Sequence, residues 1–289
     1  MLKLPGPDVA SYDYGAIGQH IVERGEMPAW LSELVGVDLG DDSMHRFKGR
    51  VAVVSGAAQG IGKAVALRLG EEGATVIAVD LNGEGAAATG KQIGVPSMSA
   101  QCDIGDPNSV SKLFATVAAK AGKLDVLVNV AAIVPFVKWD ELTFEEWRRI
   151  MRVNLDGLYL MCRAGSDMMR KSGYGRIVNF SSNSIFAGTP NMAHYVASKG
   201  GVLTFTRALA SELGAYKITA NSICPGLTDT EGVQQTPHKE AFGFVDMLQA
   251  IKGRGVPADI VPAVAFLASE EAHWITGQAL AVDAGMVRW

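Results

Sequence analysis

The chain has 289 residues, of which 48% are hydrophobic and 19% are charged. This length and composition suit one large globular domain or two small ones, and they exclude disordered and fibrous proteins. The 26 Lys and Arg residues against 30 Asp and Glu residues give a net charge of -4, without a block of like charge that could bind a phosphate backbone. We therefore expect no nucleic-acid partner.

The cysteines and the lengths of the apolar runs indicate in which cellular compartment the protein is expected. Cys102, Cys162 and Cys224 lie about 60 residues apart and form no CxxC pair, which favours a reducing, cytoplasmic compartment and no metal site. The first twenty residues lack a basic start followed by an apolar run. No segment reaches the ~20 apolar residues of a membrane span. We expect neither a secretory signal nor a membrane segment.

The N-terminal 48 residues lack a repeating pattern of strands and helices. They contain a helical pattern over Gly15–Gly25 and an apolar turn that begins at Trp30. We expect residues 1–48 to form an arm that packs on a neighbouring subunit, ahead of a nucleotide-binding domain over residues 49–289. Because Met44 stands just before that domain, translation that begins there is the alternative.

From residue 50 onward, short Val- and Ile-rich runs alternate with longer amphipathic segments. This alternation is typical of βα units around a parallel sheet that is buried on both faces. It predicts an α/β fold with a single Rossmann-type, doubly wound parallel sheet of about seven strands and helices on both faces. The predicted strands are Val51–Val54, Thr75–Val79, Ser97–Cys102, Val126–Val128, Arg176–Phe180, Thr219–Ile223 and Ala279–Val282. The predicted helices span residues 61–72, 83–93, 107–121, 143–170, 193–214 and 257–269.

A glycine-rich turn, Ser55-Gly56-Ala57-Ala58-Gln59-Gly60-Ile61-Gly62, follows the first predicted strand. Glycines let the backbone turn sharply and approach a pyrophosphate, which then lies on the N-terminus of the next helix. The second strand ends at Asp80, 24 residues after Gly56. That carboxylate can accept hydrogen bonds from an adenosine ribose and would repel a 2′-phosphate. With Leu81 beside it and no nearby arginine, the pattern predicts NAD rather than NADP.

Tyr195 and Lys199 stand four residues apart near the start of a predicted helix. This spacing puts the phenol and the ammonium group on one face of the helix. A nearby positive charge lowers the pKa of a phenol from ~10, which predicts a general base. Ser182 closes a predicted strand thirteen residues before Tyr195, so its hydroxyl can bind the same substrate oxygen.

Taken in order, these motifs resemble those of the short-chain dehydrogenase/reductase family over roughly residues 48–289. The resemblance implies a catalytic tetrad of Asn154, Ser182, Tyr195 and Lys199. In that tetrad Asn154 would hold a water that extends the proton path, and Lys199 would also bind the nicotinamide ribose. The cofactor-binding residues that the resemblance implies are Gly56, Gln59, Gly60, Ile61, Gly62, Asp80, Leu81, Asp103, Ile104, Asn129, Ala131, Tyr195, Lys199, Pro225, Gly226, Thr228 and Thr230.

The chain departs from the family pattern at three positions. Ser55 replaces a Thr but keeps a hydroxyl group. Val130 and Ala132 stand where the family has Asn and Gly after the fourth strand, which leaves open the hydrogen bonds expected to brace that strand.

The family's Pro-Gly motif resembles Pro225-Gly226 in this chain. Substrate specificity in this family is set by the segments after the fourth and fifth strands and by the segment after this motif. Here these segments combine aromatic residues with a few polar groups, which favours a small ring-bearing alcohol or hemiacetal. Likeness within the family points to pyridoxal, oxidised to 4-pyridoxolactone, and more distantly to 1-phenylethanol. The predicted pocket residues are Phe136, Phe186, His194, Phe242 and Phe244.

The sequence therefore predicts an NAD-dependent alcohol dehydrogenase acting on a small molecule. The alternatives are an NADPH-dependent carbonyl reductase of the 3-ketoacyl type, which Asp80 disfavours, and a non-catalytic NAD-binding sensor, which the complete tetrad disfavours. The resemblance also implies a homotetramer, or a homodimer, assembled through segments 143–170 and 193–214 and the C-terminal strand.

Overall fold

The computed structural model describes residues 45–94 and 96–288 of the chain. The predicted N-terminal arm and the alternative start at Met44 therefore fall almost entirely outside the described residues, as does Trp289. The compact unit begins at Arg46. Phe47 is already buried in its core.

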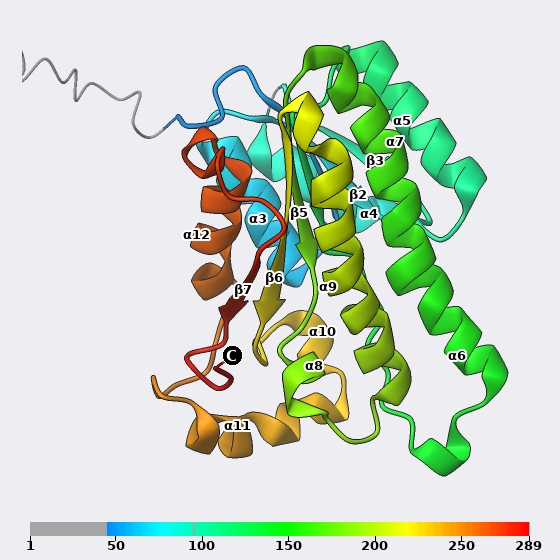
Figure 1. Ribbon diagram of the computed structural model, residues 1–289, viewed down its shortest axis with the longest axis vertical. Helices are drawn as coiled ribbons and strands as arrows, with labels where there is room; N and C mark the ends of the chain where they lie inside the picture. Colours follow the sequence, from blue (N-terminus) through cyan, green and yellow to red (C-terminus); the bar gives the residue numbers. More distant parts are fainter. Residues whose placement is uncertain (1–44, 95, 289) are drawn as a thin grey trace, which may run out of the picture. The chain divides into compact units, whose positions relative to one another are not determined.

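Seven parallel strands form a single sheet in the order β3-β2-β1-β4-β5-β6-β7 (Figure 1). Each neighbouring pair is hydrogen-bonded in parallel register. The strands are β1 (Val51–Ser55), β2 (Thr75–Asp80), β3 (Met98–Gln101), β4 (Val126–Asn129), β5 (Gly175–Phe180), β6 (Ile218–Pro225) and β7 (Ala279–Val282). The predicted doubly wound α/β fold is confirmed.

Helices cover both faces of the sheet (Figure 1). Side chains of α3 (Gly60–Glu71) and α12 (Pro257–Ala268) pack in the core of one face. Side chains of α5 (Pro107–Ala121), α7 (Gly157–Ser172) and α9 (Ala193–Leu213) pack in the core of the other. The remaining α-helices of the described chain are α4 (Gly83–Ile93), α6 (Phe144–Met151), α8 (Ser184–Ala187), α10 (Glu231–Gln234) and α11 (Phe242–Leu248). The last three were not predicted, because a helix of one or two turns leaves little periodic pattern in a sequence.

Helix boundaries follow from local chemistry, as α5 illustrates. The Asp106 carboxylate accepts hydrogen bonds from the N–H groups of Asn108 and Ser109, and Pro107 occupies the first helical position. At the other end, Gly122 adopts the left-handed conformation that terminates the helix.

The helix predicted over residues 143–170 is interrupted. A π-helical turn, η4 (Arg152–Asp156), separates α6 from α7 and contains the buried Asn154. The Asn154 amide accepts from the N–H of Ile133 and donates to its carbonyl, at 2.9 and 3.0 Å. A wide turn of this kind is common at functional sites. Its local widening has no signature in the spacing of apolar residues, which is why the sequence predicted one continuous helix.

The buried carboxylate of Asp125 connects the N-terminal ends of the central strands. It accepts a hydrogen bond from the N–H of Val51 at 2.8 Å and pairs with Arg50 and Lys123. Three donors therefore converge on one buried acceptor group, which makes its loss costly.

We expect Asp125→Asn to lower the free energy of unfolding by about 2 kcal/mol. The Asn side chain has one acceptor oxygen where Asp has two, and its NH2 group would face the N–H donors that now bind the carboxylate. Urea unfolding measures this, with the exposed Asp140→Asn as the matched control. A difference below about 0.5 kcal/mol between the two variants would contradict the assignment.

Candidate active site

The glycine turn lies between β1 and α3, where the strand order reverses from β1 to β4. Crevices at such reversals, beyond the carboxyl ends of the strands, are where doubly wound sheets bind ligands. A Cβ on Gly62 would lie 2.1 Å from the carbonyl oxygen of Gly56. A Cβ on Gly56 would lie 2.9 Å from the backbone nitrogen of Ala131, and Gly56 also has a φ of +73°. Both positions therefore require glycine.

Asp80 ends β2 directly beside this turn. Its carboxylate accepts hydrogen bonds from the N–H groups of Ala58 at 3.0 Å and Asn82 at 2.9 Å, which fix its orientation. Asp80 takes part in none of the ion pairs of the described chain, so its negative charge is not neutralised by a neighbouring cation. The adjacent Leu81 is 65% exposed. These residues, with the N-terminus of α3, fit the adenosine and pyrophosphate groups of a dinucleotide.

A carboxylate already contacts the N-terminus of α3. The Gly60 N–H donates to Oε2 of Glu231, at 3.0 Å, from the first residue of α10. Thr230, which precedes Glu231, caps α10 and lies within contact distance of a Cβ built on Gly60. The segment after β6 therefore reaches the glycine turn and presents a negative charge where a pyrophosphate would lie.

Three of the proposed cofactor residues use their side chains elsewhere. The Asn129 amide is buried and donates to Asn179 and Cys162, and its side chain does not line the pocket. The carboxylate of Asp103 accepts from the Gly105 N–H and pairs with Arg152 at 3.1 Å. Ile104 packs in the hydrophobic core. Only the backbones of Asn129 and Ile104 are left to contact a cofactor, because burial has turned their side chains inward.

Ser55, which replaces a Thr of the family pattern, makes one of the hydrogen bonds that hold the segment after β4 in place. Ser55 Oγ accepts a hydrogen bond from the Ala131 N–H at 3.3 Å. Val130 and Ala132 themselves line the pocket described below. The hydroxyl at position 55 therefore still connects β1 to the segment after β4.

Several of the other predicted cofactor residues line the pocket. Gln59 immediately precedes α3 and makes no capping hydrogen bond through its side chain. The Thr228 hydroxyl donates to the carbonyl of Gly226. Those that line the pocket are Ile61, Tyr195, Lys199, Pro225, Gly226, Thr228 and Thr230.

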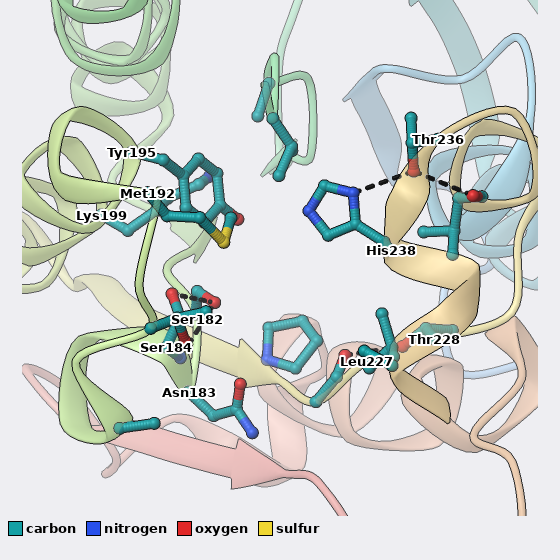
Figure 2. A pocket seen from close by; sticks show the side chains of 18 of the residues that line it. Ser182, Asn183, Ser184, Met192, Tyr195, Lys199, Leu227, Thr228, Thr236 and His238 are labelled. Atoms are coloured by element: carbon teal, nitrogen blue, oxygen red, sulfur yellow. Dashed lines mark hydrogen bonds between the residues drawn. The ribbon is translucent and has the colours of Figure 1, made fainter. Parts of the chain in front are cut away.

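The four residues of the predicted tetrad converge from three segments. Tyr195 and Lys199 lie one turn apart on α9, with the Lys199 Nζ 5.8 Å from the centre of the Tyr195 ring. Lys199 Nζ donates to the carbonyl of Phe180, at the end of β5, at 2.6 Å. Ser182 follows that strand, and all three side chains line one pocket (Figure 2). Asn154 is connected to them through Ser198, whose hydroxyl it donates to at 3.2 Å.

Burial controls the proton affinities at this site. It raises the pKa of the Tyr195 phenol to about 12, although a hydrogen bond with Ser182 acts in the opposite direction. It lowers the pKa of the Lys199 ammonium to about 8. The prediction that Lys199 holds the phenol pKa below its usual value is therefore wrong for the protein without a ligand. The reason is that removing either group from water disfavours its charged form, and this effect of burial is the largest one on each group.

Ser184 is a site residue that the sequence reasoning missed. Its hydroxyl lies 2.8 Å from that of Ser182, and its N–H donates to Ser182 Oγ at 3.2 Å. Both serines are buried and line the pocket. An N–H fixed on the Ser182 oxygen leaves the Ser182 hydrogen free to point at a substrate oxygen. The sequence does contain a Ser-x-Ser pattern, Ser182-Asn183-Ser184, directly after a strand, and this pattern could have indicated a hydrogen bond between the two serines.

The pocket has a volume of about 960 Å³ and mostly apolar walls. Of the predicted aromatic residues, Phe136 and Phe244 line it. Phe186, His194 and Phe242 do not, which corrects three predicted pocket residues. His194 is fully buried because α9 turns it about 100° away from Tyr195, toward Glu146 and Arg149. Phe242 is buried under the guanidinium of Arg254, and Phe186, on the short helix α8, is 41% exposed.

The histidine in the pocket is His238, from the segment between α10 and α11. It faces Tyr195 and Ser182 across the cavity (Figure 2). This segment follows Pro225-Gly226 and so belongs to those expected to set specificity, but the histidine predicted for the pocket is His194, which stands next to Tyr195 in the chain. Arg149, Met192 and Met286 also line the pocket without having been predicted. Arg149 is held by Glu146 through two hydrogen bonds of 2.7 and 2.8 Å.

Neither a metal cluster nor a membrane-spanning helix is found in residues 45–94 and 96–288. No group of three or more His, Cys, Asp or Glu side chains there could hold a metal ion. No helix in the same part of the chain is long and apolar enough to cross a membrane.

Known proteins resemble this chain over most of its length. Residues 56–287 match the family described as enoyl-(acyl carrier protein) reductase. Versicolorin reductase 1 of Aspergillus parasiticus is 36% identical over 260 residues, which cover 84% of this chain and 98% of that protein. D-threitol dehydrogenase of Mycolicibacterium smegmatis is 36% identical over 255 residues, covering 86% and 96% of the two chains. The 3-oxoacyl-(acyl-carrier-protein) reductase of Escherichia coli is 34% identical over 241 residues, covering 83% and 98%.

The fold also matches a solved structure that carries a different name. A crystal structure described as ribose-5-phosphate isomerase from Brucella melitensis superimposes with a TM-score of 0.80 at 34% sequence identity. The match covers 83% of this chain and 93% of that one.

The contact between Glu231 and Gly60 leads to a prediction about dinucleotide binding. We expect Glu231→Gln to lower the Kd for NADH by about two- to fivefold, because a negative charge at a helix N-terminus competes with the pyrophosphate. The measurement is titration of NADH fluorescence at low ionic strength. Glu240→Gln, an exposed carboxylate in the same segment, is the control. Weaker NADH binding by the Glu231 variant would show that the carboxylate supports the site instead of competing for it.

Proposed function

The chain belongs to the short-chain dehydrogenase/reductase family of oxidoreductases, and we propose that it is an NAD-dependent dehydrogenase of a small ring-bearing alcohol or hemiacetal. One observation carries the proposal: Tyr195, Ser182 and Lys199 line a single apolar pocket that lies beside the glycine turn. A nucleotide site and a proton-transferring phenol at one crevice are what alcohol oxidation requires.

The side chains have separable roles in the proposed reaction. Ser182 donates a hydrogen bond to the substrate oxygen, and Tyr195 accepts the proton that this oxygen loses. When bound, an oxidised nicotinamide dinucleotide accepts a hydride and carries a positive charge that lowers the pKa of a nearby phenol. Lys199 contributes positive charge next to the phenol below a pH of about 8. Asn154 holds the backbone of Ile133, which keeps the segment after β4 against the pocket.

The walls of the pocket support a neutral, largely apolar substrate. Among the described residues no carboxylate lines it, and its charged or basic side chains are Arg149, Lys199 and His238. Phe136, Phe244 and Met192 supply apolar surface that suits an aromatic or alicyclic ring. Pyridoxal in its hemiacetal form, oxidised to 4-pyridoxolactone, is the substrate that we propose first, and 1-phenylethanol is the simpler analogue.

The second candidate is a carbonyl reductase of the 3-ketoacyl type that uses NADPH. The names of the versicolorin and 3-oxoacyl relatives favour the reductive direction. Asp80 argues against the phosphorylated cofactor, because its carboxylate would lie beside the 2′-phosphate without a compensating cation.

Sugar-phosphate isomerisation, which the name of the similar crystal structure suggests, is less well supported. A phosphate needs unpaired cations or several N–H donors. In the described pocket Arg149 is paired with Glu146, and Lys199 donates to the Phe180 carbonyl. A coupled assay with ribose 5-phosphate distinguishes the two activities.

We expect Tyr195→Phe to lower turnover by at least ~10²-fold, the usual scale for loss of a general base. The measurement is NAD reduction at 340 nm with pyridoxal and with 1-phenylethanol. NADH binding should be retained, since the ring that packs in the pocket remains. Retained turnover in the variant would refute the role of the phenol, and loss of NADH binding would point to a structural defect.

Asp80→Ala should reduce the ratio of kcat/KM for NAD to that for NADP by at least about tenfold, because it removes a ribose hydrogen-bond acceptor and a negative charge. Both cofactors are measured with one alcohol under the same conditions. The control is Glu84→Ala, an exposed acid in the first turn of α4. An unchanged ratio for the Asp80 variant would mean that another group recognises the ribose.

A further inference from the structure

His238 combines three features that the proposed reaction does not use. It lines the pocket across from Tyr195 and Ser182, as Figure 2 shows. Its ring packs on Phe136, with the ring centres 4.0 Å apart and the planes at 54°. Its Nε2 is removed from water and has no hydrogen-bond partner among the described residues. A buried nitrogen without a partner costs free energy that a bound ligand can recover.

The hydrogen bonds of Thr236 determine which ring nitrogen carries the proton. Thr236 Oγ1 donates its single hydrogen to the carbonyl of Val233, at 2.9 Å. The 2.8 Å contact between His238 Nδ1 and Thr236 Oγ1 must therefore be donated by Nδ1. It follows that Nδ1 holds the proton and that Nε2 offers a lone pair.

The environment of the imidazole favours its neutral form. Burial lowers the pKa of His238 below its ordinary value, and no carboxylate of the described chain lines the pocket to oppose that effect. A neutral acceptor in an apolar wall favours a neutral donor such as a hydroxyl group. It gives no advantage to a carboxylate, and an ether cannot donate to it.

We propose that His238 Nε2 accepts a hydrogen bond from a second hydroxyl group of the substrate, distinct from the hydroxyl of the carbon that is oxidised. The inference rests on the proposed dehydrogenase function of the same pocket. It narrows the substrate class to molecules that carry one oxidisable carbinol and one further hydroxyl, such as phenolic benzylic alcohols. His238 is then a specificity-determining residue, fixed by Thr236 and Phe136.

The test compares substrates that differ only in the ability to donate this hydrogen bond. The 2-, 3- and 4-hydroxyphenyl analogues of 1-phenylethanol are each paired with the corresponding methoxyphenyl analogue, and kcat/KM is measured with NAD. At one ring position or more, the wild-type protein should prefer the hydroxy over the methoxy compound by about tenfold. His238→Phe should reduce that preference to within twofold, and His238→Gln, which keeps an acceptor, should restore part of it.

The control variant is Lys239→Met, an exposed residue of the same 3-10 turn, which should keep the wild-type preference. If His238→Phe keeps the preference as well, or loses activity equally on both members of each pair, the proposal is overturned.

A binding measurement separates failure of this inference from failure of the proposed function. The NADH complex of each variant is titrated with 3-hydroxyacetophenone and 3-methoxyacetophenone, and with their 2- and 4-substituted isomers, by calorimetry. Tighter binding of hydroxy ketones that depends on His238 supports the inference even if no alcohol is oxidised, in which case only the proposed dehydrogenase activity fails. Equal affinities in wild type, or no binding of any of these ketones, overturn the role of His238.

Discussion

The site depends on how closely two backbones approach at the point where the strand order reverses. Gly56 lies against the backbone of Ala131, and Gly62 lies against the carbonyl of Gly56, so neither position has room for a side chain. This contact brings the N-terminus of α3 and the segment after β4 to one crevice. The phosphate-binding turn and the wall of the substrate pocket are therefore parts of a single packed unit, joined also by the hydrogen bond from Ala131 to Ser55.

Buried amides hold the rest of the site in position. Asn129 donates to Asn179, which donates to Thr206 on α9, so that β4, β5 and α9 are joined beneath the pocket. Asn154 holds Ile133 at both backbone groups and reaches α9 through Ser198. Because unpaired buried amides are costly, these chains of hydrogen bonds favour one relative placement of the strands and α9. The phenol and the ammonium group of α9 are thereby placed beside Ser182.

The dry pocket that results controls both reactivity and selectivity. Burial raises the pKa of Tyr195 and lowers that of Lys199, so in the protein without a ligand the phenol keeps its proton near pH 8, while the ammonium group loses its proton as the pH rises through about 8. Burial also lowers the pKa of His238 and so favours its neutral form, which has an acceptor nitrogen in an apolar wall. In the proposed reaction, the bound cofactor supplies a positive charge beside Tyr195, and the substrate supplies a hydroxyl group for His238. Both proposals therefore follow from the same exclusion of water from the pocket.

The sequence by itself determined the alternation of strands and helices, the glycine turn, Asp80 at the end of β2 and the i, i+4 pair of Tyr195 and Lys199. Each of these depends on residues close together in the chain, where spacing and conformational preference act directly. Only the tertiary structure decided that Asn129 turns inward, that Ser184 reaches Ser182, and that His238, not His194, enters the pocket. The direction of the Tyr195 pKa was also decided there. These properties depend on which distant segments exclude water from a side chain, and local patterns in the sequence do not specify that exclusion.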